Sequence, residues 1–307
     1  MDKITSTTVR DSFNDRNVVL HYARAAHQLG LWASERLLIE RWLVDRNASV
    51  LEVGCGAGRV TFGLWDLGYQ RLTAVDFADE LLDQARRLAD LRAITAIRFL
   101  PADATQLSRC HLLNDKHDGA TDAAPAGPCE ESTDRPEGRG FAAALFMFNG
   151  LMQIPGRQNR RQALREIRAV CRPGAPLLFT THDRDDDSRH QPLWADEAGR
   201  WARGEQDPRL VEFGDRYFEN ELGGHTFMHL PNRTEVLEDM EAAGWVPRFD
   251  AMRRALAPES AAVREFSDEC RFWVAQSTAI GAFGFHHSKQ KPSDESEGLI
   301  TDRLAGA

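Results

Sequence analysis

Cysteine is scarce in this chain of 307 residues, and its five cysteines are scattered along it. Their number is odd, and no two of them form a C-x-x-C pair. Disulfide frameworks and structural zinc sites place their cysteines in pairs at regular spacings. The sequence therefore argues against both, predicts no metal site and favours a reducing compartment such as the cytoplasm. The cysteines are Cys55, Cys110, Cys129, Cys171 and Cys270.

Basic residues and long apolar runs are also in short supply. Lysine and arginine number 38 against 47 acidic residues, a net charge of −9, whereas a protein devoted to nucleic acid needs a basic surface. No run of 18 apolar residues occurs, so we expect no membrane span. The first residues lack an apolar core, so we expect no signal peptide. The 42% of hydrophobic residues suffices for the core of one large domain.

Against this background one segment stands out, Val50–Thr61, which reads V-L-E-V-G-C-G-A-G-R-V-T. An apolar strand leads into a G-x-G-x-G run, and a helix-like stretch follows. The glycines are Gly54, Gly56 and Gly58. Glycine permits a tight turn and a close ligand, and the free N–H groups of the helix start favour a negatively charged one. The next strand ends at Asp76, which suits ribose hydroxyls, although an aspartate there is also a common helix cap.

The spacing of the glycines distinguishes between cofactors. Dinucleotide enzymes use G-x-G-x-x-G around a pyrophosphate, whereas this tighter run, with Glu52 two residues before the first glycine, suits a ligand without phosphates. The pattern resembles motif I of the class I S-adenosylmethionine (SAM)-dependent methyltransferases. By order and spacing, the resemblance extends from about residue 34 to residue 276. A nucleotide-binding domain of another type, such as an NAD-linked enzyme, is the alternative.

The resemblance implies an α/β fold that is Rossmann-like and doubly wound. Its seven-stranded sheet would be mostly parallel, with an antiparallel last strand, a helical N-terminal cover and polar insertions. The alternation of strands and helices independently indicates a parallel sheet with right-handed crossovers. We predict strands at 49–53, 71–76, 96–100, 141–148, 176–181, 225–230, 245–251 and 270–276.

Composition divides the chain further. The N-terminal cover should contain two helices, the second of them capped by Ser34. Two stretches rich in polar residues interrupt the domain, the first disordered and the second on the substrate side, and a disordered tail follows. The expected parts are the cover at 1–48, the SAM-binding domain at 49–276, the insertions at 108–140 and 183–224, and the tail at 286–307.

The resemblance also implies where the cofactor binds. The glycines and Glu52 would hold the methionine part of SAM, Asp76 and Phe77 the ribose and adenine, and Asp103 the adenine amino group. The implied cofactor residues are Glu52, Gly54, Gly56, Gly58, Asp76, Phe77, Asp103, Ala104, Phe148 and Asn149. The fourth strand departs from the family, because it begins Phe141-Ala142 where many members have Phe-Asp.

Two other polar groups invite functional interpretations. His182 follows the fifth strand, at the carboxyl edge where α/β sheets place ligands, and is the candidate general base. The acidic run 185–187 suggests a Mg²⁺ site, but we interpret it as a solvated loop. The arginines of 157–172 alternate with apolar residues, which predicts an amphipathic helix with its arginines in water rather than a nucleic-acid stripe.

The sequence says far less about the molecule that accepts the methyl group. Tyr22, Trp194 and Tyr217 are candidates for a substrate pocket, with ordinary packing as the alternative. Methyl transfer depends on placement more than on a catalytic motif. We expect methylation of a small molecule at oxygen or nitrogen. The alternatives are a methyltransferase acting on protein or RNA, which should show a basic groove, and a non-catalytic SAM-binding module. The oligomeric state stays open.

Overall fold

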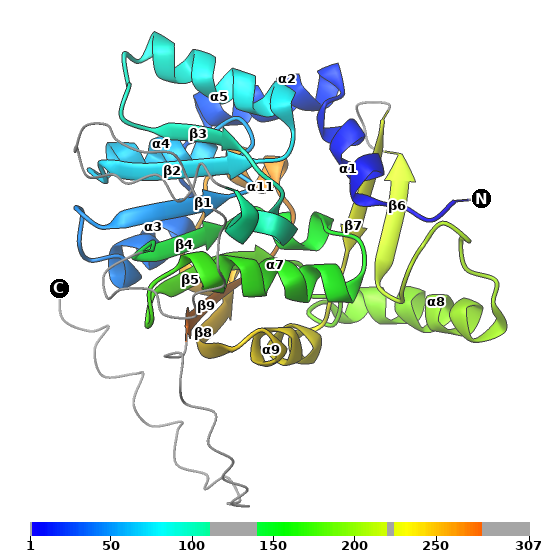
Figure 1. Ribbon diagram of the computed structural model, residues 1–307. Coiled ribbons are helices and arrows are strands. Elements are labelled where there is room, and N and C mark those ends of the chain that lie inside the picture. The colour runs from blue at the N-terminus through cyan, green and yellow to red at the C-terminus, as the bar shows by residue number, and fades with distance from the viewer. Residues whose placement is uncertain (1, 111–139, 220–223, 278–307) are drawn as a thin grey trace, which may run out of the picture.

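The computed structural model describes residues 2–110, 140–219 and 224–277 (Figure 1). Of the predicted insertion at 108–140, residues 111–139 lie outside the described part of the chain, and so does the whole predicted tail at 286–307. Among the described residues, no helix is both long enough and apolar enough to cross a bilayer.

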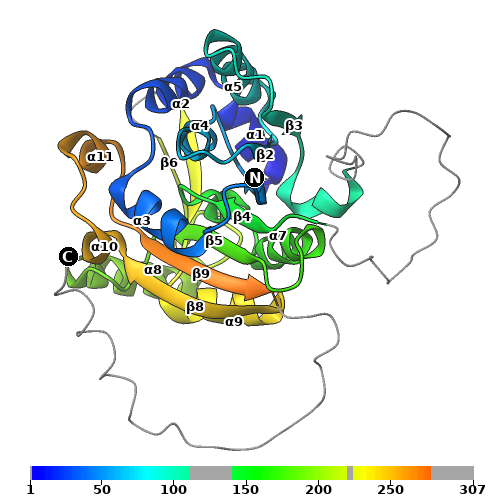
Figure 2. The same cartoon turned by 90° about the vertical axis from the view of Figure 1, so that its left-hand side faces the viewer.

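A seven-stranded sheet forms the centre of the fold, in the order β3-β2-β1-β4-β5-β9-β8, with β3 and β8 at opposite edges (Figure 2). Strand β9 pairs antiparallel with both of its neighbours, β5 and β8, whereas all the other pairs in this sheet are parallel. The predicted fold class, including the antiparallel last strand, is confirmed. The strands are β1 (Ser49–Val53), β2 (Arg71–Asp76), β3 (Arg98–Pro101), β4 (Ala143–Phe146), β5 (Pro176–Thr181), β8 (Trp245–Met252) and β9 (Arg271–Ser277).

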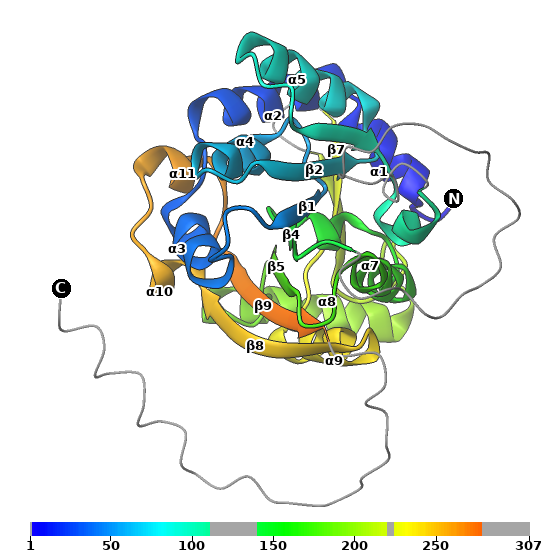
Figure 3. The same ribbon diagram turned by 60° about the vertical axis from the view of Figure 1, so that its left-hand side comes forward.

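Helices cover both faces of the sheet, and α3 and α7 lie on opposite sides of it (Figure 3). Because side chains alternate along a strand, β1 serves both cores: Val50 packs with Leu64 on one face, and Leu51 with Leu164 on the other. The first face carries α3 (Ala33–Trp42), α4 (Arg59–Asp66) and α5 (Asp79–Leu91), and the second carries α7 (Arg157–Val170) and α9 (Arg233–Ala242).

The N-terminal cover contains one helix more than predicted. Besides α2 (Arg16–Gln28) and α3, the structure has α1 (Ser6–Phe13), which lies beside the two-stranded sheet of β6 and β7 (Figure 1). The predicted cap at Ser34 is wrong, because the N-cap of α3 is Trp32. Glu259, which precedes α11 (Ala261–Phe266), instead accepts hydrogen bonds from the N–H groups of Ala33 and Ser34 at 3.0 and 2.9 Å.

The polar stretch 183–224 is more regular than its composition indicates. It contains α8 (Gln191–Arg203) and β6 (Asp215–Glu219), and β6 pairs antiparallel with β7 (His225–His229) in a separate sheet. His229 is fully buried, and its Nδ1 and Nε2 lie 2.8 and 2.6 Å from carboxylates of Asp215 and Glu235. Burial alone would lower the pKa of His229, but these two hydrogen bonds outweigh it and raise the pKa. His229 thereby joins β6 and β7 to α9.

The arginines of α7 do not form the solvated face that we predicted. Arg160 is only 1% exposed, and its Nη2 lies 3.0 Å from Glu212 and 3.4 Å from Glu235. Arg157 and Arg161 both donate to the Asp239 carboxylate of α9, at 2.6 and 2.7 Å. The prediction failed because acidic residues distant in sequence supply the partners. These arginines therefore fasten α9 and the 183–224 stretch to α7.

A buried ion pair joins the N-terminal cover to the helix that follows the glycine run. The guanidinium of Arg59 donates to both carboxylate oxygens of Glu35, at 2.6 and 2.7 Å, and to the carbonyl of Gly30 at 2.8 Å. It also lies over the ring of Trp32, 4.6 Å from the centroid. Glu35 is completely buried and Arg59 is only 8% exposed, so both charges are largely shielded from water. Each charge is tolerated because the other lies beside it.

Removal of the buried carboxylate should therefore destabilise the fold. We expect Glu35→Gln to lower the free energy of unfolding by about 3–5 kcal/mol, because Arg59 is left buried without a counter-charge. The exposed pair of Arg36 and Glu40 provides the control, and Glu40→Gln should cost below about 1 kcal/mol. Urea unfolding followed by circular dichroism measures both. Equal effects of the two substitutions would contradict the structural role of the buried pair.

Candidate functional site

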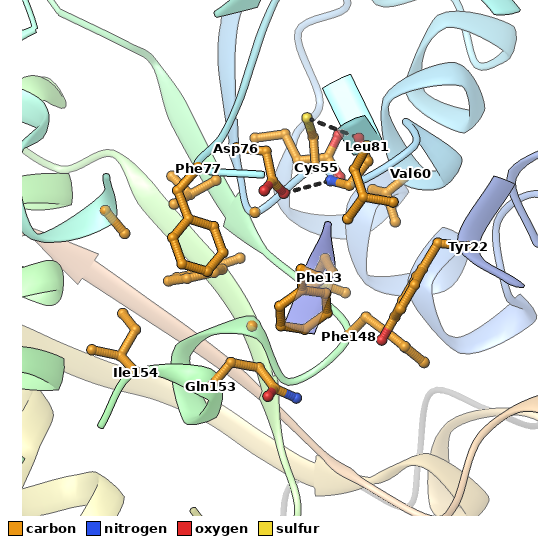
Figure 4. A pocket seen from close by; sticks show the side chains of 18 of the residues that line it. Phe13, Tyr22, Cys55, Val60, Asp76, Phe77, Leu81, Phe148, Gln153 and Ile154 are labelled. Atoms are coloured by element: carbon orange, nitrogen blue, oxygen red, sulfur yellow. Dashed lines mark hydrogen bonds between the residues drawn. The ribbon is translucent and has the colours of Figure 1, made fainter. Parts of the chain in front are cut away.

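A cleft of about 1090 Å³, counted to its open mouth, lies at the carboxyl ends of β1, β2 and β4. In Figure 4 Asp76 and Phe77 lie on one side of it and Tyr22 and Phe148 on the other. Open α/β sheets bind their ligands at this edge. Eight of the ten residues predicted to bind the cofactor line the cleft: Glu52, Gly54, Gly56, Asp76, Phe77, Asp103, Ala104 and Phe148.

The glycine run forms the floor of the cleft through a backbone conformation that other residues rarely adopt. Gly54, Gly56 and Gly58 have φ angles of 65°, 53° and 88°. A β-carbon at Gly54 would lie 2.7 Å from the ring of Phe146, whereas one at Gly56 would meet only Leu81, at 3.9 Å. Gly56 is thus the glycine that leaves space in the cleft. Gly58 does not line it and instead begins α4.

Asp76 joins the two loops that enclose the cleft. Its Oδ2 accepts a hydrogen bond from the Gly56 N–H at 2.7 Å, and its Oδ1 accepts one from the Ala78 N–H at 2.9 Å. Asp76 is not the helix cap that we considered as the alternative, because the N-cap of α5 (Asp79–Leu91) is Ala78; Asp76 instead lines the cleft. Burial raises the pKa of this carboxyl, although the backbone N–H groups counteract that effect. Each oxygen keeps a further lone pair for a ligand.

Glu52 is a buried acid that forms no ion pair within the part of the chain that the structure describes. Its side chain is 4% exposed and accepts a hydrogen bond from the hydroxyl of Thr61. Burial raises the pKa of Glu52 to about 8, because a carboxylate is poorly solvated there. The group is therefore mostly protonated at pH 7, and it would ionise if a positively charged group bound beside it.

The cleft is also lined by Asp103, Ala104 and Phe77. Asp103 Oδ1 caps the short helix η1 (Ala104–Arg109), accepting from the N–H of Thr105 at 2.8 Å and from its hydroxyl at 2.7 Å. The second carboxylate oxygen remains for a ligand. Phe77 adds an aromatic surface next to Asp76 (Figure 4). A planar polar ring would find both stacking and hydrogen bonding here.

Asn149 and His182 are coupled to each other. Strand β4 ends earlier than predicted because the chain turns at Phe148 and Asn149, with φ angles of 53° and 59°. His182 Nδ1 lies 3.0 Å from the carbonyl oxygen of Glu269, so it carries the proton, and Nε2 then accepts from the Asn149 amide at 3.2 Å. Burial lowers the pKa of His182. Both nitrogens are engaged, and His182 lines neither cavity described here.

The arrangement assigns His182 to positioning Asn149 rather than to accepting a substrate proton. Asn149 is 3% exposed and does not itself line the cleft, although both of its neighbours in sequence do. Its Oδ1 is buried and has no hydrogen-bond partner among residues 2–110, 140–219 and 224–277. A buried acceptor of this kind is costly unless a ligand supplies a donor.

The three predicted substrate-pocket residues have different locations. Tyr22 lines the cleft and also a second cavity beside it. Tyr217 lines neither cavity but stacks on His225, with centroids 5.1 Å apart. Trp194 packs edge-on against Phe213, at 5.8 Å, and lines neither cavity either. For Trp194 and Tyr217 the packing interpretation describes the structure.

The second cavity contains residues that sequence reasoning missed. It holds about 780 Å³ of empty space, counted to its mouth, and shares Phe13, Tyr22 and Gln153 with the first. Phe13 was missed together with α1, and Gln153 lies on the short helix η2 (Gly150–Gln153), for which the sequence carries no signal. The residues that line this cavity are Val9, Ser12, Phe13, Val18, His21, Tyr22, Gln153, His225, Thr226 and Phe227.

Carboxylates that might attract a cation are paired with arginine. Asp186 and Asp187 of the acidic run bond Arg254 and Arg189. In the described part of the chain, Glu212, Asp215 and His229 come close enough to hold an ion. Arg160 contacts Glu212, however, and carboxylates occupy both nitrogens of His229. This cluster is therefore already neutralised without a metal.

Comparison with protein families matches residues 50–124 to the model of a family described as a methyltransferase domain. The match begins in β1 and includes the glycine run, β2 and β3. No curated protein sequence matches the chain significantly.

Solved structures of low identity share the fold. A SAM-dependent methyltransferase from Methanosarcina mazei is 16% identical, with a TM-score of 0.55 over 81% of this chain and 99% of that one. Magnesium protoporphyrin IX methyltransferase from Synechocystis PCC 6803, solved with bound S-adenosylhomocysteine, is 12% identical, with a TM-score of 0.51 over 89% and 99%. The cyclase SpnF is 15% identical, with a TM-score of 0.56 over 91% and 98%.

Gly56 offers a direct test of the cleft. We expect Gly56→Ala to weaken binding of S-adenosylhomocysteine at least tenfold in titration calorimetry, because a methyl group would stand in the cleft next to Leu81. The left-handed backbone should also cost about 1 kcal/mol of stability. Gly204, with φ of 70° and open space around it, is the matched control. Gly204→Ala should lose similar stability and keep its affinity. Unchanged affinity in folded Gly56→Ala would exclude this cleft as the site.

Proposed function

We propose that this chain is a SAM-dependent methyltransferase and that it transfers the methyl group to an oxygen or nitrogen atom of a small molecule. The observation that carries this proposal is the second cavity, which adjoins the cofactor cleft at Phe13, Tyr22 and Gln153. A cavity between α1, α2, η2 and β7 suits a compact acceptor better than a polymer.

The residues of the cleft fit the cofactor. The buried carboxyl of Glu52 suits its ammonium group, and Gly56 leaves room in the cleft. Asn149 does not line the cleft but stands between the lining residues Phe148 and Gly150 in sequence, and its unpartnered Oδ1 suits the same group. The spare lone pairs of Asp76 suit ribose hydroxyls, and those of Asp103 the adenine amino group. Bound SAM supplies a methyl group that its sulfonium makes electrophilic. The remaining task of the protein is to place the acceptor and exclude water.

The charges around the two cavities also support a small acceptor. A protein or RNA substrate calls for a basic groove beside the methyl group. Among the described residues that line the cavities, Arg59 carries the one guanidinium, and no lysine is present. Arg59 is buried against Glu35 and is therefore not offered to a polymer.

Proton removal from the acceptor requires a base near the boundary of the cavities. Burial raises the pKa of Tyr22 to about 12, so its hydroxyl remains a hydrogen-bond donor at neutral pH. His21 lines the acceptor cavity and stacks on Phe266 with centroids 4.7 Å apart, and Phe266 lines the cofactor cleft. Imidazole accepts protons near neutrality. We assign His21 the role of general base, in place of His182.

The raised pKa of Glu52 leads to a prediction about proton release. At pH 7 a carboxyl with a pKa of about 8 is mostly protonated, and an ammonium group bound beside it lowers that pKa. Binding of S-adenosylhomocysteine should therefore release roughly 0.5–1 proton more from the wild type than from Glu52→Gln. Calorimetry in buffers of different ionisation enthalpy measures the difference, which should vanish above about pH 9. Equal release by both proteins would contradict the assignment.

A methyl-transfer assay tests the proposed function itself. Incubation with methyl-labelled SAM and a library of small metabolites should yield a labelled product of low molecular mass. We expect His21→Phe to lower kcat about 100-fold, because a positioned base contributes a factor of this order. His27 lies exposed on the same helix and lines neither cavity, so His27→Phe is the control and should change kcat less than about threefold. Label transferred only to protein or RNA, or to nothing while the cofactor binds, would overturn the proposal.

A further inference from the structure

Gln153 holds a buried amide that the protein itself does not satisfy. Its Oε1 is shielded from solvent and has no hydrogen-bond partner in the described segments of the chain. Its Nε2 donates to the thioether sulfur of Met228 at 3.5 Å, a weak acceptor. A buried acceptor without a hydrogen bond destabilises the protein, because it has lost its bonds to water. The amide is therefore poorly satisfied at both ends in the unliganded protein.

The position of Gln153 places its unsatisfied amide where the molecule that accepts the methyl group would bind. Gln153 lines both the cofactor cleft and the second cavity, and Figure 4 shows its amide beneath Phe13. It ends η2, the helix that directly follows the corner at Phe148 and Asn149. A group at the junction of the two cavities lies where an acceptor must enter to reach the cofactor. The partner that Oε1 lacks is therefore expected from the acceptor.

Aromatic rings dominate the rest of the cavity wall. Phe13, His21, Tyr22, His225 and Phe227 all line it. Phe13 and Tyr22 lie 5.8 Å apart at an interplanar angle of 55°, and His21 meets Tyr22 edge-on at 5.6 Å. The ring of Tyr217 stacks on His225, with centroids 5.1 Å apart. Rings fixed in this way favour a planar aromatic guest by offset stacking and edge contacts.

We propose that the second cavity binds a planar aromatic molecule with a hydroxyl or N–H group, and that Gln153 Oε1 accepts the hydrogen bond from that group. Gln153 is then a positioning and specificity residue, because a site built around a buried acceptor rejects an analogue that lacks the donor. The inference rests on the proposed function, of which it specifies the acceptor class. It predicts a preference for phenol-like over ether-like ligands.

The test compares two ligands of similar shape in the complex with S-adenosylhomocysteine. We expect calorimetry to show that 2-naphthol binds wild-type protein at least tenfold more tightly than 2-methoxynaphthalene does. Gln153→Met keeps the length of the side chain without the amide and should reduce this ratio below threefold. Gln153→Glu retains an acceptor oxygen and should retain the preference. The affinity of each variant for S-adenosylhomocysteine should stay within twofold of wild type.

Ser12 supplies a control in the same cavity. Its hydroxyl already donates to the Thr8 carbonyl at 3.2 Å, so Ser12→Ala should leave the naphthol preference unchanged. Absence of naphthol binding, equal binding of the two ligands, or a preference that survives Gln153→Met would overturn the inference. The methyl-transfer assay separates it from the proposed function. Transfer to acceptors without a ring or a donor would refute the inference alone, whereas Gln153-dependent binding without transfer to any small molecule would refute only the function.

Discussion

The carboxylate of Asp76 is the contact on which the cofactor cleft depends. One oxygen holds the N–H of Gly56 in the loop after β1, and the other holds the N–H of Ala78 at the start of α5. The apolar cluster of Ala57, Ala78 and Leu81 also joins these two loops. Because the charge is buried, its cost is offset by those N–H groups, and the spare lone pairs remain directed to a ligand.

The acceptor side depends on a different kind of contact, made between segments far apart in the chain. The pair of Arg59 and Glu35 fastens the N-terminal cover to α4, and Glu259 caps α3 from the C-terminal region. His229 fastens β7 to α9 through Glu235. These buried charges are neutralised only by one another, so the parts they join are held in a defined arrangement. One of these parts, β7, contributes to the wall of the second cavity.

Much of the fold was predictable because the strands carry local signals. The predicted bounds of β1, β2 and β5 agree with the structure, since the apolar runs of β1 and β2 end at glycine and aspartate and a Pro-Gly turn precedes β5. The helices α1 and α8 were missed. Their residues are largely polar, and they are helical mainly through contacts with distant segments. Eight of ten expected cofactor residues line the cleft because they follow the ends of adjacent strands.

The donor side was predictable from the sequence alone, because the glycine run, Glu52 and Asp76 lie within 25 residues of one another and resemble the SAM-binding pattern. Which residues form the acceptor side became clear only from the tertiary structure. His182 turned out to be held by Asn149 and Glu269, and Gln153 turned out to join the two cavities. The difference comes from the separation in sequence between the groups that interact. A glycine turn and a strand end are set by local backbone geometry, whereas the pairing of buried polar groups is settled only when distant segments pack.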